Sequence, residues 1–215
     1  MAIIDLNKKR NTSGGYNRLM GNSDISNMVT SIHSASISTG TQVSKRLEWS
    51  YEGNLPIFSG KEVNTPNKTL KIIENNPRGL IIFNGYIKGK GGKKQEIDVM
   101  VYDGEVCHVG EIKDGNSLDT KKSPAEINGI ESSVDYLKSK GYCVEGKLIL
   151  MHMEDNQHSI KDDRAENYIQ SGYDFCSQHS FSFDKFKDYQ KNQESINEKI
   201  VLDEMLRILR KKGIL

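Results

Sequence analysis

Residues 96–113 read EIDVMVYDGEVCHVGEIK, and this stretch predicts a β-hairpin. Residues 97–102 and 106–113 are runs of apolar and β-branched residues, which favour strands. Between them, Asp103-Gly104 is a strong signal for a tight turn that joins two antiparallel strands. Asp98 interrupts the first apolar run, and Glu111 and Lys113 are two residues apart, so these two share one face of the second strand. The hairpin therefore carries two carboxylates and a lysine.

The segments next to the hairpin extend it into a mixed sheet. Residues 80–87 form an apolar strand, which a glycine-rich loop at 88–94 connects to the hairpin. After the hairpin, Ser123 followed by Pro124, with Glu126 three residues on, is typical of a helix start, and the helix should run to about residue 140. Residues 144–151 are apolar enough for a central strand. The order of helix, three strands, helix and strand indicates an α/β (α+β) fold with a mixed β-sheet flanked by helices.

The flanks are less strongly patterned. Residues 1–22 are polar and read as an arm. We expect a first helix from Ser23, a break over the Ser/Thr-rich residues 34–40, and a second helix from Thr41 to about Tyr51. Proline and glycine in 53–69 indicate a long surface excursion.

The C-terminal part predicts two more helices, at residues 160–169 and at about 194–212. The apolar side of the last one is broad, so it either closes the core or forms a dimer interface. We expect one domain over residues 1–215. Its core is at about 40–152, with an N-terminal arm and helix at 1–39 and a helical C-terminal extension at 153–215.

Composition restricts the class of protein. The chain has 215 residues, 30 Lys plus Arg against 29 Asp plus Glu, and a formal net charge of +1. This excludes a histone-like basic protein but permits a local basic cleft. No run approaches the roughly 18 apolar residues that a membrane span requires. The three cysteines form no C-x-x-C pair, and the N-terminus lacks the order of a secretory signal, so we expect a cytoplasmic protein without structural zinc or disulfides.

The two carboxylates of the hairpin predict a cation site. If the Asp103-Gly104 turn pairs the strands, Asp98 lies within a few residues of the register of Glu111, and the strands can diverge there. Two converging carboxylates suit a hard cation, of which Mg²⁺ is the commonest. Lys113 beside them can hold or activate a water molecule, or neutralise charge on a phosphate. The alternative is a surface ladder of salt bridges, which the apolar neighbours of Asp98 argue against.

Asp98, twelve further residues and then Glu111-x-Lys113, on the second and third strands of such a core, resemble the PD-(D/E)XK nuclease superfamily. The resemblance covers about residues 40–152, although Ile97 stands where the motif has proline. It implies a restriction-endonuclease-like core and Mg²⁺-dependent hydrolysis of phosphodiesters that leaves 5′-phosphates, with Mn²⁺ able to substitute. Asp98, Glu111 and the carbonyl of Ile112 would then be metal ligands, and Lys113 would orient the attacking water. Glu48 would be a further carboxylate from the preceding helix, with Gln42 as a weaker option.

Within this superfamily, a chain of this size is most similar to a type II restriction endonuclease, which implies double-stranded DNA as substrate and a homodimer. A nuclease toxin or RNase and a structure-selective resolvase are alternatives within the fold, although a resolvase is usually shorter and more basic. A non-catalytic nucleic-acid-binding protein is a further alternative, but carboxylates that repel phosphate would not help it. The candidate DNA-binding residues are Lys88, Lys90, Lys93, Lys94, Lys121 and Lys122. The first four could also form a solvated hairpin tip.

Four other residues have structural interpretations. His108 is three residues before Glu111, so strand alternation puts it on the opposite face, as a packed or edge histidine. We expect Trp49, Cys107 and Cys143 to lie in the core.

Overall fold

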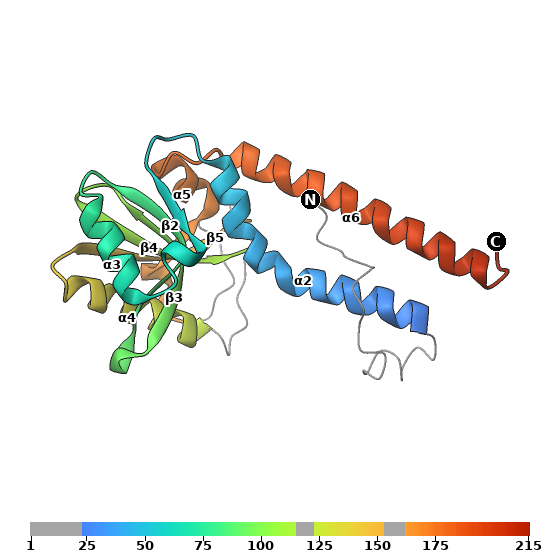
Figure 1. The fold of residues 1–215 in the computed structure, drawn as a ribbon, viewed down its shortest axis with the longest axis horizontal. Coiled ribbons are helices and arrows are strands. Elements are labelled where there is room, and N and C mark those ends of the chain that lie inside the picture. The colour runs from blue at the N-terminus through green and yellow to red at the C-terminus, as the bar shows by residue number, and fades with distance from the viewer. Residues whose placement is uncertain (1–22, 115–122, 153–161) are drawn as a thin grey trace. The chain divides into compact units, whose positions relative to one another are not determined.

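The computed structural model describes residues 23–114, 123–152 and 162–215 (Figure 1). The described strands form one six-stranded sheet in the order β1-β2-β3-β4-β5-β6. The strands are β1 (Ile57–Ser59), β2 (Leu80–Lys88), β3 (Lys94–Tyr102), β4 (Val106–Lys113), β5 (Cys143–Leu150) and β6 (Ile169–Ser171). β2, β3 and β4 pair antiparallel, whereas β1, β5 and β6 run parallel to their neighbours. The prediction of a mixed α/β sheet protein is thus confirmed.

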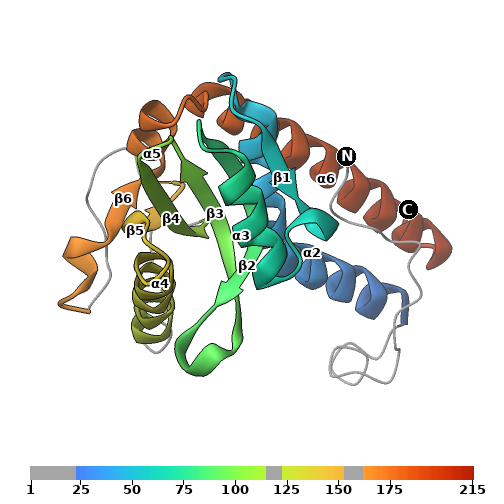
Figure 2. The same cartoon turned by 60° about the vertical axis from the view of Figure 1, so that its left-hand side comes forward.

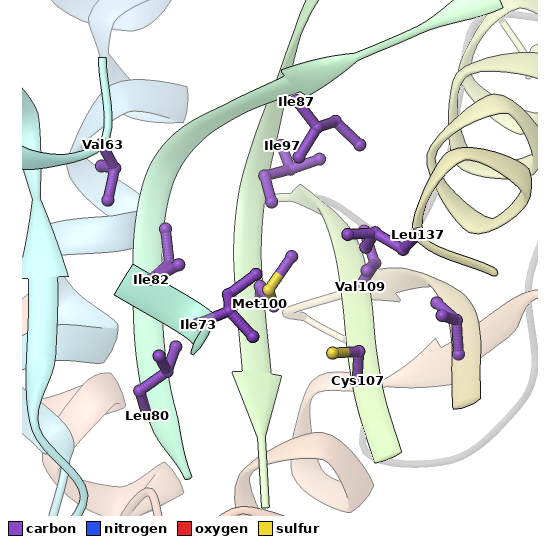
Figure 3. Close-up of a cluster of buried hydrophobic side chains, with 11 residues drawn as sticks. Val63, Ile73, Leu80, Ile82, Ile87, Ile97, Met100, Cys107, Val109 and Leu137 are labelled. Carbon is purple, nitrogen blue, oxygen red and sulfur yellow. The ribbon is translucent and has the colours of Figure 1, made fainter. Parts of the chain in front are cut away.

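Helices α3 (Pro66–Asn75) and α4 (Ser123–Lys138) lie over one face of this sheet (Figure 2). Figure 3 shows the core beneath them, where Ile73 of α3 and Leu137 of α4 meet Ile82, Met100 and Val109 of the strands. These side chains are almost fully buried. Burying apolar surface of this kind supplies about 25 cal/mol per Å², so this cluster stabilises the packing of α3 and α4 on the sheet.

The opposite face packs against aromatic residues. Phe83 of β2 meets Phe181, which in turn stacks on Phe175 of α5 (Gly172–Gln178) at a centroid distance of 5.6 Å. α5 begins at Ser171, whose hydroxyl accepts a hydrogen bond from the N–H of Asp174 and so satisfies one N-terminal donor. The sheet therefore has a helical or aromatic cover on both faces.

The chain forms two compact units. One comprises Val43–Phe183, with the sheet and its covering helices, and the other contains the remainder of helices α2 (Ser23–Ser50) and α6 (Phe183–Lys211). Within the second unit, Lys211 Nζ lies 2.7 Å from Asp24 Oδ2, so the C-terminus of α6 is linked to the start of α2.

The structure corrects the predicted helical flanks. α2 is continuous, so the predicted break at residues 34–40 is wrong. Ser, Thr and Gly each cost a helix up to about 1 kcal/mol, but without proline no residue blocks the backbone hydrogen bonds. α6 begins at Phe183, well before residue 194. None of the described helices is long and apolar enough to cross a membrane.

Two segments predicted otherwise contain short strands. The surface excursion at 53–69 includes β1, the 3₁₀ turn η1 (Gly60–Glu62) and the start of α3. The side chain of Thr65 caps α3 by accepting a hydrogen bond from the N–H of Lys68, and Pro66 follows at the first helical position. The helix at 160–169 is also wrong, because η3 (Ala165–Asn167) leads directly into β6. Three-residue strands are held by backbone pairing and leave little pattern in the sequence.

Two of the predicted core residues are exposed. Trp49 is 53% exposed, because Arg46, Leu47 and Ser50 occupy the buried side of α2. Cys143 is exposed at the first position of β5, while Cys107 in the middle of its sheet is buried as predicted.

Candidate active site

β3 and β4 separate at the position of Asp98 and Glu111. Their ladder runs from Tyr102↔Cys107 to Val99↔Gly110 and ends there, so the next opposed pair would be Asp98 and Glu111. β4 itself continues beside β5 as far as Lys113↔Leu150. The predicted divergence is therefore present, and Asp98 is directly opposite Glu111, closer than we expected from the sequence.

The carboxylate of Asp98 takes over the hydrogen bond that β3 no longer makes. Its Oδ2 accepts from the backbone N–H of Ile112 at 2.8 Å. On the other side of β4, Lys113 O accepts from the N–H of Met151 on the β5 side. Because the backbone groups of successive strand residues point to alternate edges, the carbonyl of Ile112 is directed toward the gap beside Asp98.

Lys113 is held between two carboxylates. Its Nζ lies 2.7 Å from Glu111 Oε1 and 2.8 Å from Glu126 Oε1, and about a quarter of each of these side chains is exposed. Glu126 comes from the first turn of α4, where the sequence suggested only a capping role. The sequence pattern alone did not place Glu126 in the site. α4 is fixed over this region by Gln95 of β3, whose Nε2 donates to Gly129 O at 2.6 Å and to Ser133 Oγ at 2.9 Å.

Burial and mutual repulsion shift the pKa values of this cluster. Burial raises the pKa of Asp98, and burial together with the charge of Asp98 raises the pKa of Glu111 to about 8. Burial alone would lower the pKa of Lys113, but Glu111 and Glu126 outweigh it and raise that pKa, so the amine is cationic. A divalent cation beside Asp98 and Glu111 would relieve the repulsion between their charged forms.

A second set of charged residues lies at the end of β4, around Asp114. The buried guanidinium of Arg46 on α2 lies 2.7 Å from Asp114 Oδ2 and is only 3% exposed. His152 Nε2 lies 3.4 Å from the other oxygen, Asp114 Oδ1. Although burial opposes it, the pKa of Asp114 is lowered by His152 and Arg46. The pairing of Arg46 with Asp114 could not be predicted, because residues 68 positions apart along the chain give no local signal.

Other predicted site residues lie apart from this cluster. Glu48 is exposed and forms no hydrogen bond or ion pair with the described residues of the cluster, because two helical positions from Arg46 put it on the other side of α2. The structure therefore does not bring Glu48 together with Asp98, and Glu126 is the further carboxylate near the pair. His108 is buried as predicted, with Asp103 and Glu145 within 3.7 Å and 3.5 Å of its ring nitrogens.

The β2–β3 hairpin tip carries exposed positive charge. Lys88, Lys93 and Lys94 are exposed there, and Lys94 Nζ lies 3.6 Å from the centre of the Tyr86 ring. The backbone of Lys90 forms the 3₁₀ turn η2 (Lys90–Gly92) at the tip. Lys121 and Lys122 lie outside the described residues. DNA contact by these lysines stays a prediction.

Comparison with known proteins gives one informative match. The chain is 23% identical over 221 residues to the type II restriction enzyme HhaII of Haemophilus parahaemolyticus, and the alignment covers 93% of this chain and 91% of that enzyme. The chain is distantly related to a type II restriction enzyme. No family model matches the chain, and no solved structure matches it. The relationship therefore rests on similarity along nearly the whole length of both chains, at low identity.

Proposed function

We propose that this protein is a Mg²⁺-dependent endonuclease of the PD-(D/E)XK superfamily that cleaves double-stranded DNA as a type II restriction enzyme and leaves 5′-phosphates. The observation that carries the proposal is the meeting of Asp98, Glu111 and Lys113 where β3 and β4 part. The distant relative supports it, because that enzyme is a type II restriction enzyme.

The residues present fit a hard divalent cation. Asp98, Glu111 and the carbonyl of Ile112 would hold Mg²⁺, with Mn²⁺ as a substitute. Among the described residues, no group of three or more His, Cys, Asp or Glu side chains is arranged to hold a metal. Mg²⁺ suits a site with only two carboxylates, because it usually keeps several waters and takes phosphate oxygens as ligands. When bound, the ion would neutralise charge on the scissile phosphate and acidify a coordinated water.

The protein's own groups then position the reactants. The cationic amine of Lys113 donates hydrogen bonds, so it can orient a water oxygen in line with the phosphorus atom, and it is held for this by Glu111 and Glu126. Attack by that oxygen forms a P–O bond, releases a proton of the attacking water to bulk water, and breaks the bond between phosphorus and the 3′-oxygen. The 3′-oxygen takes a proton from water, and the phosphate stays on the 5′-end. The exposed lysines of the β2–β3 hairpin supply positive charge for the DNA backbone.

The direct test is cleavage of plasmid and phage DNA by the purified protein with Mg²⁺, with Mn²⁺ and with a chelator. We expect discrete fragments with either metal, 5′-phosphate ends, and no cleavage with chelator. Asp98→Asn should reduce cleavage by at least about 100-fold while DNA binding persists. The matched control is Glu105→Gln, an exposed carboxylate in the turn of the same hairpin, which should cleave like the wild type.

Three results would contradict the proposal in different ways. Cleavage that survives in the Asp98→Asn variant would overturn the site. A smear would point to a nuclease without sequence specificity. Intact duplex DNA together with cleavage of RNA or of branched DNA would keep the site and replace the substrate.

A further inference from the structure

Asn84, in the middle of β2, has a left-handed backbone with φ of 52°. Residues other than glycine rarely adopt positive φ, and asparagine is among the few that tolerate it. Among the described residues, Ser180 is the other such case, with φ of 61° in the turn after α5. A left-handed residue inside a strand is unusual, and it changes the direction of the strand and its pairing with the neighbouring strand.

Asn84 lies opposite Asp98. The β2–β3 ladder contains the pairs Phe83↔Val99 and Gly85↔Ile97 but is interrupted at the pair between them, which would be Asn84 and Asp98. On the other side of β3, the ladder with β4 ends at Val99↔Gly110. Asp98 is thus at the position where the β2–β3 ladder skips one pair and the β3–β4 ladder has ended, and its carboxylate accepts from the N–H of Ile112.

Both strands also change face at this point. Ile82 and Ile87 of β2 belong to the same buried cluster although they are five residues apart, and so do Ile97 and Met100 of β3, three residues apart. A regular strand would direct residues at odd spacing to opposite faces of the sheet. Figure 3 shows β2 bending between Ile82 and Ile87. The left-handed residue lies within that bend.

A hydrogen bond from α2 holds Asn84 at the bend of β2. The hydroxyl of Ser44, which is buried, donates to Asn84 Oδ1 at 3.3 Å. The asparagine is therefore suited to the position in two ways, by its tolerance of positive φ and by its side-chain acceptor.

We propose that Asn84 is a positioning residue for Asp98. Its left-handed backbone interrupts the ladder and turns β3, so that the Asp98 carboxylate lies against the N–H of Ile112. The relevance of this to metal binding rests on the proposed function, whereas the geometry of Asp98 can be tested without any metal.

The first measurement is amide hydrogen exchange by NMR on the metal-free full-length protein. Asn84→Gly keeps positive φ accessible, whereas Asn84→Val opposes it, and Asn84→Ala serves if the valine variant fails to fold. Both glycine and alanine remove the bond to Ser44, so their difference isolates the backbone. The exchange protection of Ile112, taken relative to Val144 in the same sheet, should stay within about twofold in the glycine variant. It should fall by about fivefold or more in the valine or alanine variant.

Ser180 gives the matched control, because Ser180→Gly and Ser180→Ala change backbone strain at the other left-handed residue. Both should leave the relative protection of Ile112 unchanged. A folded alanine or valine variant of Asn84 with the same relative protection as the glycine variant would overturn the proposal.

The second measurement is Mn²⁺ affinity by electron paramagnetic resonance, without DNA. Asn84→Ala should bind Mn²⁺ about fivefold more weakly than Asn84→Gly, and the two Ser180 variants should bind it equally. Wild-type protein that binds no Mn²⁺ would contradict the proposed function, and the exchange of Ile112 would still decide the role of Asn84.

Discussion

Lys113 contacts two carboxylates, and we expect them to contribute differently to holding its amine. Glu111 is a proposed metal ligand, so a bound cation would compete with Lys113 for its oxygens. Glu126, 2.8 Å from the same amine, would then be the main group that fixes Lys113. We expect Glu126→Gln to lower the rate of DNA cleavage by roughly tenfold, a smaller loss than Asp98→Asn causes, because the amine and both metal ligands remain.

Single-turnover cleavage at saturating Mg²⁺ measures the effect of Glu126→Gln. Asp135→Asn, an exposed carboxylate on the same helix, is the control and should cleave like the wild type. A Glu126→Gln variant with unchanged rate would show that Glu111 alone holds Lys113.

We expect His179 to make the free energy of unfolding depend on pH. Burial lowers its pKa to about 4, and the neighbouring His108 adds to this, while Asp103 works the other way. In the unfolded chain the imidazole has its ordinary pKa of about 6.5, so between the two values the unfolded state binds more protons. The free energy of unfolding should therefore fall as the pH drops from about 6.5 to 4, by up to about 3 kcal/mol from this group.

Urea unfolding at pH 7 and pH 4.5 tests the role of His179. The variant His179→Gln cannot titrate, so it should lose less stability between these two pH values than the wild type does. Equal losses in the two proteins would assign the effect to other groups.

At the scale of the elements, Gly110 is needed where β3, β4 and β5 crowd together. A Cβ atom there would meet Ile149 Cδ1 and lie 2.7 Å from Val99 Cγ1, and Val99↔Gly110 is the last pair before the strands part. We expect Gly110→Ala to lower the free energy of unfolding by about 1–3 kcal/mol through overpacking. Gly129→Ala on α4 is the contrast. Its Cβ would meet only Gln95 Nε2 of β3, at 3.4 Å, and alanine favours a helix, so we do not expect this variant to lose stability.

Chemical denaturation of the two glycine variants separates these effects. If Gly110→Ala proved as stable as the wild type, β4 would have room to move away from Val99. The close packing of Gly110 against Val99 would then not determine where β3 and β4 separate.

The elements that could be predicted from sequence are those with long, regular patterns. The hairpin at 96–113, β2, α4 and β5 have strong apolar periodicity or clear caps, and the structure confirms them. β1 and β6 could not be predicted in this way, because three residues paired by backbone groups carry no period.

The candidate site divides in the same manner. Asp98, Glu111 and Lys113 could be found because strand alternation and one turn place them, whereas Arg46 and Asp114 are 68 residues apart and meet only through the packing of α2. The kink at Asn84 was also invisible, because a left-handed asparagine in a strand leaves no pattern.

At the scale of the whole molecule, the number of active sites matters. Each chain carries one cluster of Asp98, Glu111 and Lys113, and cutting both strands of a duplex in one binding event needs two such clusters. A homodimer, which the resemblance to type II restriction endonucleases implies, would supply them. α6 offers a surface for it, because Leu202, Met205 and Leu206 are exposed at 51%, 44% and 41%, on another side of the helix from the buried Ile208. With Leu209 they follow the i, i+3, i+4, i+7 spacing of a helix that packs against another helix.

In such a homodimer, we expect the exposed stripe of α6 to pack against a second copy of this chain. The stripe consists of Leu202, Met205, Leu206 and Leu209. The double variant Leu202→Gln with Leu206→Gln should shift sedimentation equilibrium toward the monomer, because it removes apolar area that dimerisation would bury. Its thermal unfolding at low concentration should change little, since both side chains are exposed in the single chain. Nicking of one plasmid strand should persist while double-strand cleavage falls. Ile214→Gln, exposed beyond the end of α6, is the control. A double variant that stays dimeric would place the interface elsewhere, and a monomeric wild type that makes double-strand cuts would remove the need for one.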